Sequence, residues 1–162
     1  MHLALYQPDI PQNLGAFIRL SACLGVPLHI IEPCGFPLNE RKIRRTAMDY
    51  YDKAEITRHA GWEEFMGMIR LSDDQMNGTD NSPIICSSDH RIILLTTQAA
   101  ADYRSIEYHP SDILLLGRES AGVPEEVHEA ANLRVMIPMQ PGCRSLNVTL
   151  AAAMVLGRGL EA

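Results

Sequence analysis

The chain has 162 residues, of which 46% are hydrophobic, so one domain of ordinary size can close a core without metals or disulfides. The apolar runs, such as Ile92 to Leu95, are far shorter than the roughly 20 residues that a membrane span requires. No signal-peptide pattern follows Met1, and we expect a cytoplasmic protein. The net charge of -6 excludes nucleic-acid binding by the overall field, so any RNA site must be a local basic patch.

Cysteine and histidine spacing gives no sign of a metal site. The four cysteines are too scattered for a Cys-x-x-Cys pair, and the six histidines supply no His-Glu-x-x-His pattern. We therefore expect ordinary thiols and no metal.

Short apolar runs alternate with segments of helical periodicity, which predicts an α/β fold whose mostly parallel sheet is flanked by helices. The first strand covers residues 3–6, and the first helix covers 14–24 and ends at Gly25, which can adopt a left-handed cap. A strand at 28–31, a helix at 40–48, a strand at 55–58 and a helix at 62–69 follow. Next come strands at 92–96 and 113–116, a helix at 124–131, a strand at 135–137 and a helix at 147–156, near whose start Asn147 lies.

Residues 72–90 interrupt this alternation. The stretch is polar, acidic and rich in turn-forming residues, so it can bury little surface. Because no internal repeat or linker accompanies it, we interpret it as a mobile insertion within a single domain that spans residues 1–162.

Three segments marked by glycine or proline lie where predicted strands end, at residues 11–19, 116–124 and 137–147. In open α/β sheets ligands bind beyond the carboxyl ends of the strands, so these segments favour a binding crevice. Each is also compatible with a tight turn followed by a helix cap. The stretch from Gly117 to Gly122 is one residue off the Gly-x-Ser-x-Gly pattern of hydrolases, and no phosphate loop or dinucleotide fingerprint occurs. Hydrolase, nucleotide-triphosphate and NAD chemistry are therefore unsupported.

Taken together, the three segments resemble the motifs of the 2'-O-methylating branch of the SPOUT superfamily of RNA methyltransferases, over nearly the whole chain. The matching patterns are Asn13-x-Gly15-x-x-x-Arg19, Gly117-Arg118-Glu119-x-x-Gly122-x-Pro124, and Ile137-Pro138-Met139 followed by Arg144-Ser145-Leu146-Asn147. The short length and the stretches at 28–33 and 44–50 are similar to those of small members that modify the wobble ribose of leucine tRNAs. The resemblance implies a C-terminal deep trefoil knot, a homodimer, and S-adenosylmethionine as the cofactor.

The same resemblance implies roles for individual residues. Backbone groups in the knot loops would hold the cofactor at Leu95, Gly117, Ile137, Ser145 and Leu146, although Leu95 and Ile137 could equally be core residues. The implied catalytic residues are Arg19, Glu119, Ser145 and Asn147.

The role of Arg19 needs a chemical interpretation, because a guanidinium has a pKa above about 12 and accepts no hydrogen bond. We assign it to the phosphate beside the target ribose and to the developing alkoxide. Glu119 would orient Arg19, while Ser145 and Asn147 would position the ribose or the cofactor. A surface salt bridge is the alternative role for Glu119, and capping of the last helix is the alternative for the other two.

The sequence has one dense basic cluster, and helical spacing places three of its members on a shared face. We interpret the cluster as the RNA patch, and a solvated helix face is the alternative. Tyr50 and Tyr51 follow it closely and can stack on an unpaired anticodon base or contribute to a dimer interface. The cluster consists of Arg41, Lys42, Arg44 and Arg45, of which Arg41, Arg44 and Arg45 share the face.

The expected function is 2'-O-methylation of a tRNA ribose, at the wobble nucleotide, a C or a modified U, of leucine tRNAs. One alternative is the same reaction at another tRNA position or in rRNA. The alternative from another class is a non-catalytic knotted RNA-binding protein. The joint presence of Arg19, Glu119, Ser145 and Asn147 favours an enzyme.

Overall fold

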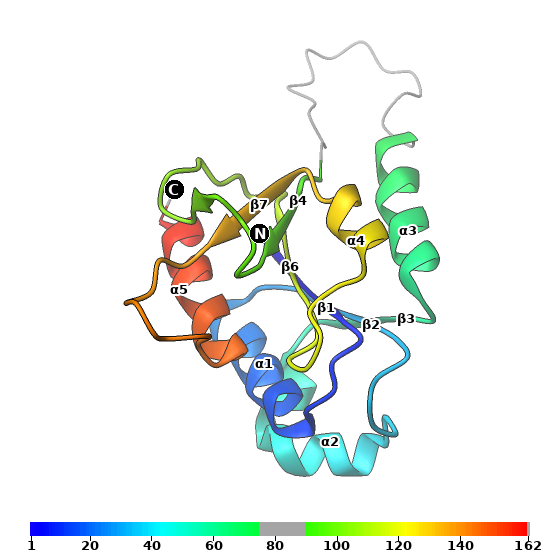
Figure 1. Ribbon diagram of the computed structural model, residues 1–162. Helices are drawn as coiled ribbons and strands as arrows, with labels where there is room; N and C mark the ends of the chain where they lie inside the picture. Colours follow the sequence, from blue (N-terminus) through cyan, green and yellow to red (C-terminus); the bar gives the residue numbers. More distant parts are fainter. Residues whose placement is uncertain (75–89, 162) are drawn as a thin grey trace.

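The computed structural model describes residues 1–74 and 90–161, without the side chains of residues 40, 42 and 70–74. Seven strands form one sheet in the order β3-β2-β1-β6-β4-β7-β5, and every ladder between neighbouring strands is parallel (Figure 1). This confirms the predicted mostly parallel sheet. The strands are β1 His2–Tyr6, β2 Leu28–Ile31, β3 Ile56–His59, β4 Ile92–Leu95, β5 Ala101–Asp102, β6 Ile113–Leu116 and β7 Leu133–Met136.

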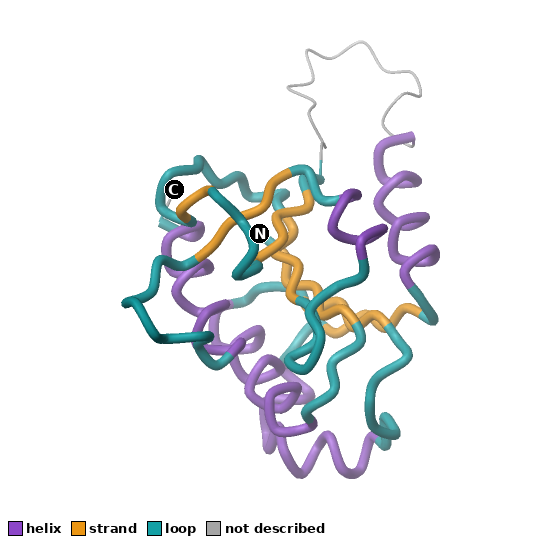
Figure 2. Tube along the Cα trace, in the orientation of Figure 1, coloured by secondary structure: helices purple, strands orange, loops and turns teal. Residues whose placement is uncertain are grey.

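Helices connect the strands in the alternating order that the sequence predicts (Figure 2). The first begins at Pro11, where the missing N–H costs nothing, and ends at Leu24. The next residue, Gly25, has a φ of 64° and forms the expected left-handed cap. None of the helices in the described part of the chain has the length and apolar character needed to cross a bilayer. The helices are α1 Pro11–Leu24, α2 Glu40–Ala47, α3 Trp62–Asp74, α4 Glu125–Ala130 and α5 Val148–Leu160, with a 3-10 helix, η1, at Met48–Lys53.

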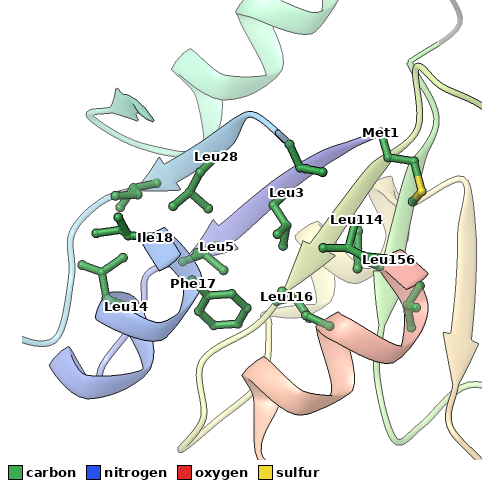
Figure 3. Close-up of a cluster of buried hydrophobic side chains, with 14 of the residues drawn as sticks. Met1, Leu3, Leu5, Leu14, Phe17, Ile18, Leu28, Leu114, Leu116 and Leu156 are labelled. Carbon is green, nitrogen blue, oxygen red and sulfur yellow. The ribbon is translucent and has the colours of Figure 1, made fainter. Parts of the chain in front are cut away.

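Alternating side chains along the strands divide the core into two layers, one on each face of the sheet. On one face, Leu3 and Leu5 of β1 pack beneath α1 and α5, as Phe17 and Leu156 show in Figure 3. On the other face, the neighbouring residues of β1 contact α3 and α4, with Phe65 fully buried. The sheet is therefore covered by helices on both faces, as parallel sheets require.

Besides small shifts of element boundaries, helix α3, strand β5 and the 3-10 helix η1 differ from the sequence predictions. Helix α3 continues through Ser72 to Asp74, where we expected the insertion to begin, because its earlier turns are already fixed against the sheet and adding residues to a formed helix is favourable. The rest of the predicted insertion, residues 75–89, lies outside the described residues. Strand β5 was missed because a strand of two residues leaves no periodic pattern.

Candidate active site

A cavity of about 460 Å³ opens at the carboxyl ends of β4, β6 and β7. This volume lies within the range of small-molecule sites, roughly 300 to 1,000 Å³, and the place is where open parallel sheets bind ligands. The cavity brings together all five residues that the resemblance assigns to the cofactor. They are Leu95 at the end of β4, Gly117 after β6, Ile137 after β7, and Ser145 and Leu146 before α5.

Glycines shape the turn that follows β6. The backbone N–H groups of Arg118 and Gly122 each donate to the other's carbonyl oxygen at 2.9 Å, and Gly122 has a φ of 67°. A Cβ on Gly117 would lie 2.6 Å from the carbonyl carbon of Gly122, closer than any real side-chain contact. Only glycine at position 117 allows this turn to fold tightly against the cavity.

A chain of hydrogen bonds joins three elements along the cavity. The Asn147 side-chain oxygen caps α5 by accepting from the N–H groups of Thr149 at 3.0 Å and Leu150 at 3.3 Å, which confirms its predicted capping position. Its Nδ2 donates to Oδ1 of Asn13 at 3.2 Å. The Nδ2 of Asn13 in turn donates to Oε1 of Glu119 at 2.8 Å. The start of α5, the start of α1 and the turn after β6 are thus held in one polar arrangement that lines the cavity.

The Glu119 carboxyl is half-buried beside a second carboxyl, that of Asp9. Burial, followed by the interaction with Asp9, raises the pKa of Glu119 above its ordinary value, whereas the bond from Asn13 opposes the rise. The pKa of Asp9 falls to about 2, chiefly through its interaction with Glu119. As the pH rises, Asp9 therefore loses its proton first and Glu119 stays protonated to a higher pH.

Arg19 lies apart from this cavity in the single chain. It is exposed on α1, six residues after Asn13, which is about 9 Å along the helix axis. Its guanidinium carbon lies 4.7 Å from the centre of the Tyr50 ring, a cation-π distance. The expected contact with Glu119 does not occur within one chain of the described structure, where Glu119 accepts from the Asn13 side chain and the Asp9 backbone.

The basic cluster lies on α2, which packs against α1 and η1. Arg41 and Arg45 are exposed. The Arg44 guanidinium contacts Asp52 at 2.6 Å and covers the Tyr51 ring at 4.5 Å, so part of its charge is satisfied within the chain. The side chain of Lys42 lies outside the described residues.

Comparison with known proteins identifies the family. The model of the SpoU rRNA Methylase family matches residues 1–157. The chain belongs to this family.

Two relatives of this chain are named as tRNA methyltransferases that act on cytidine 34. The tRNA (cytidine(34)-2'-O)-methyltransferase of Beijerinckia indica subsp. indica is 49% identical over 159 residues, which cover 98% of this chain and 89% of the relative. The enzyme of the same name from Escherichia coli is 32% identical over 158 residues, covering 96% and 89%. A solved structure concerning "the 2-OH methylation of C/U34 on tRNA" superposes with a TM-score of 0.82 at 31% identity, covering 99% of this chain and 93% of the other.

A more distant SpoU methyltransferase, AviRb from Streptomyces viridochromogenes in complex with the cofactor AdoMet, has a TM-score of 0.84 at 19% identity. It covers 99% of this chain and 59% of the other, and at this identity it supports the fold alone.

Two polar residues of the SpoU site were not singled out from the sequence. Asn13 belongs to the first motif, and Asp9 lies just before that motif. Both follow β1, whose carboxyl end lies at the same edge of the sheet as the cavity, so the strand-end rule that located the other segments also points to them.

Proposed function

We propose that the chain transfers a methyl group from S-adenosylmethionine to the ribose 2'-hydroxyl of nucleotide 34, the wobble position, of leucine tRNAs in the cytoplasm. The observation that carries this proposal is one cavity lined by all five expected cofactor positions and by Asn13, Glu119 and Asn147. The names of the relatives at 49% and 32% identity support the choice of nucleotide 34.

The cavity fits the proposed cofactor. Apolar side chains such as Leu95 and Leu116 suit its adenine ring, while Gly117 brings backbone close to the ligand without a side chain in between. We expect the last third of the chain to form the deep trefoil knot whose loops present this backbone. When bound, the cofactor supplies a methyl group already activated on a sulfonium. The protein therefore has only to align the ribose and assist loss of its proton, and it requires no metal.

Different polar residues position the substrate and stabilise the developing charge. Asn147 and Ser145, at the start of α5, position the ribose or the cofactor, and the bond from Asn147 to Asn13 fixes the Asn147 amide in one orientation. Arg19 binds the phosphate next to the target ribose and stabilises the negative charge that develops on the 2'-oxygen.

Arg19 reaches the cavity from a second copy of the chain in a homodimer. It does not line the cavity of its own chain. Three large apolar side chains stand exposed at this end of the chain. One lies just before α5 and lines the cavity, and the other two are four residues apart on α5 and therefore share one helix face. These are Leu146, Leu150 and Met154, with exposed fractions of 44%, 62% and 42%. Exposed apolar side chains that gather near a binding cavity support the proposal that this part of the chain is an interface.

A complementation experiment tests both the reaction and the shared site. Arg19→Ala abolishes methyl transfer and leaves cofactor affinity nearly unchanged, whereas Gly117→Ala abolishes cofactor binding and keeps Arg19. If Arg19 acts across the dimer, co-expressing the two inactive variants restores about a quarter of the wild-type activity. Half of the random dimers are then mixed, and each mixed dimer contains one complete site.

The outcomes are distinct. Full activity of Arg19→Ala removes Arg19 from the mechanism. Inactive mixtures of variants that do form dimers show that Arg19 serves its own chain. Absence of methyl transfer by the wild-type protein, with tRNA binding retained, favours the non-catalytic RNA-binding alternative. Methyl transfer to rRNA or to another tRNA nucleotide overturns the proposed substrate.

The exposed arginines of α2 bind the tRNA backbone, with Tyr50 nearby to stack on a base. Charge reversal at Arg41 and Arg45 should weaken tRNA binding and lower the slope of log affinity against log salt by roughly 0.7 to 0.9 for each lost phosphate contact. Arg104→Glu is the matched control, since Arg104 is an exposed arginine outside α2 that pairs with Asp102. If the slope of log affinity against log salt is unchanged in the α2 variants, the cluster does not bind RNA phosphates and is an ordinary solvated helix face.

A further inference from the structure

Asp9 joins the loop after β1 to the turn that carries Glu119. Its Oδ1 accepts from the backbone N–H of Glu119 at 3.2 Å, and its Oδ2 accepts from the backbone N–H of Ser120 at 3.3 Å and from the Ser120 hydroxyl. In return, the Asp9 backbone N–H points at Oε2 of Glu119 at 3.4 Å. One aspartate thus holds two consecutive residues of the turn.

A second loop supports Asp9 from the other side. Gly35, after β2, approaches so closely that a Cβ there would lie 2.7 Å from the Cβ of Asp9. The Gly35 N–H donates to the carbonyl of Pro8 at 3.0 Å, which fixes the backbone immediately before Asp9. The aspartate is therefore held in place between two loops and is not a freely rotating surface side chain.

The geometry leaves each oxygen of Glu119 with a defined neighbour. Oε1 accepts from the Asn13 side chain at 2.8 Å, and Oε2 faces the backbone N–H of Asp9 at 3.4 Å. The Asp9 and Glu119 side chains also interact with each other. Because two ionised carboxylates can only accept, an attractive contact between them requires one shared proton.

No charged group among the other described neighbours of the Asp9 and Glu119 carboxyl groups forms an ion pair with either of them. Ser120 donates to Asp9, and Asn147 contacts the pair only through Asn13. The Arg118 guanidinium is engaged with Gln7. Burial and the contact with Asp9 both raise the pKa of Glu119, while the pKa of Asp9 falls to about 2, so the shared proton resides on Glu119.

On the basis of the proposed function, we propose that Asp9 is a positioning residue of the active site, which fixes the turn after β6 and shares one proton with Glu119. A protonated Glu119 donates to Asp9 and directs Oε1 at Asn13, which in turn orients Asn147. The negative charge of the pair then rests on Asp9, which does not line the cavity, while Glu119 does. Such a placement suits a site that must admit the phosphates of an RNA.

Asp9→Asn tests this role because asparagine keeps one oxygen for the backbone N–H groups and loses the charge. The titration of the Glu119 carboxyl is followed in the free protein by carbon-13 NMR of labelled glutamate, with Glu119→Gln to assign the signal. In the wild type Glu119 should titrate above the ordinary range of glutamate. In Asp9→Asn it should titrate at a pH lower by about one or more, because the neighbouring anion is gone. Ser120→Ala, which removes only the hydroxyl contact, should leave the titration in place.

In Asp9→Asn, the profile of kcat/KM for methyl transfer against pH should also shift to lower pH. A merely structural role of Asp9 would not produce that shift. Identical Glu119 titrations in the wild type and in folded Asp9→Asn would overturn the proposal. If Asp9→Asn does not fold, a wild-type Glu119 that titrates in the ordinary range would overturn it equally. Because the titration needs neither RNA nor turnover, a failure of the proposed reaction leaves this test intact.

Discussion

Acidification should destabilise the protein through a row of three histidines on neighbouring strands. His2 on β1, His29 on β2 and His59 on β3 lie side by side on the face of the sheet that α3 covers. Nδ1 of His2 is 3.2 Å from Nε2 of His29, and Nδ1 of His29 is 3.1 Å from Nε2 of His59. His29 is buried between its neighbours and the Phe65 ring. Burial, followed by repulsion from His2, His59 and His90, lowers the pKa of His29 from 6.5 to about 4.

The sign of the effect follows from proton binding. Between pH 6.5 and about 4 the unfolded chain protonates His29 and the folded chain does not, so acid favours unfolding. The stability from neutral His29 is complete above pH 6.5 and is lost as the pH falls toward 4. At 1.36 kcal/mol for each unit of pKa, this single group removes about 3 kcal/mol of unfolding free energy. His2 and His59, whose pKa values burial also lowers, add to the loss, although Glu55 and Glu64 oppose it.

Urea unfolding between pH 7.5 and pH 4.5 measures this dependence. His29→Leu should flatten the loss of stability with falling pH. The variant should be less stable at pH 7.5, because the ring nitrogens of His2 and His59 lose their hydrogen-bond partner on His29. His109→Leu, which removes an exposed histidine, should keep the wild-type dependence. A wild-type curve with the same slope as that of His29→Leu would refute the assignment of the pH dependence to this row.

Two further predictions concern the active site. Gly117→Ala places a methyl group 2.6 Å from the backbone of Gly122, so calorimetry should detect no binding of S-adenosylhomocysteine. Gly157→Ala, where a Cβ meets nothing within 4 Å, should bind it normally, and equal affinities in the two variants would contradict the account of the turn. Asn147→Ala removes the cap of α5 and the bond to Asn13. Thermal denaturation should therefore show that the free energy of unfolding falls by about 1 kcal/mol or more, and the variant should also lose methyl transfer. Asn147→Asp should restore the cap and its stability, and stability equal to that of Asn147→Ala would contradict the capping role.

Much of the fold could be predicted because its signals are local. The apolar runs of β2 and β6 were located to the residue, since each is bounded by polar or turn-forming residues. The end of α1 followed from Gly25, which alone can adopt the left-handed cap without strain. By contrast, β5 and η1 arise from tertiary contacts, which leave little local pattern.

Part of the candidate site could likewise be predicted from local patterns, whereas its long-range contacts could not. The rule that ligands bind at the carboxyl ends of parallel strands located the segments 116–124 and 137–147, and the family resemblance pointed to Gly117, Ile137 and Ser145 within them. All three line the cavity. The orientation of Arg19 by Glu119 stays a prediction, because the single chain shows only the bonds from Asn13 and from the Asp9 backbone to Glu119. The association of Asp9 with Glu119 joins residues 110 positions apart, and only the folded sheet brings them together.

The most direct test of the proposed function is to map ribose methylation in tRNA. Mass spectrometry of purified leucine tRNAs, from cells with and without this gene product, locates the methyl group by nucleotide. The account predicts a 2'-O-methyl group on nucleotide 34 that disappears without the protein and returns when the purified wild-type protein and S-adenosylmethionine are added, but not with Arg19→Ala. Unchanged methylation of nucleotide 34 in cells that lack the protein, or a methyl group lost from a different nucleotide, would contradict it.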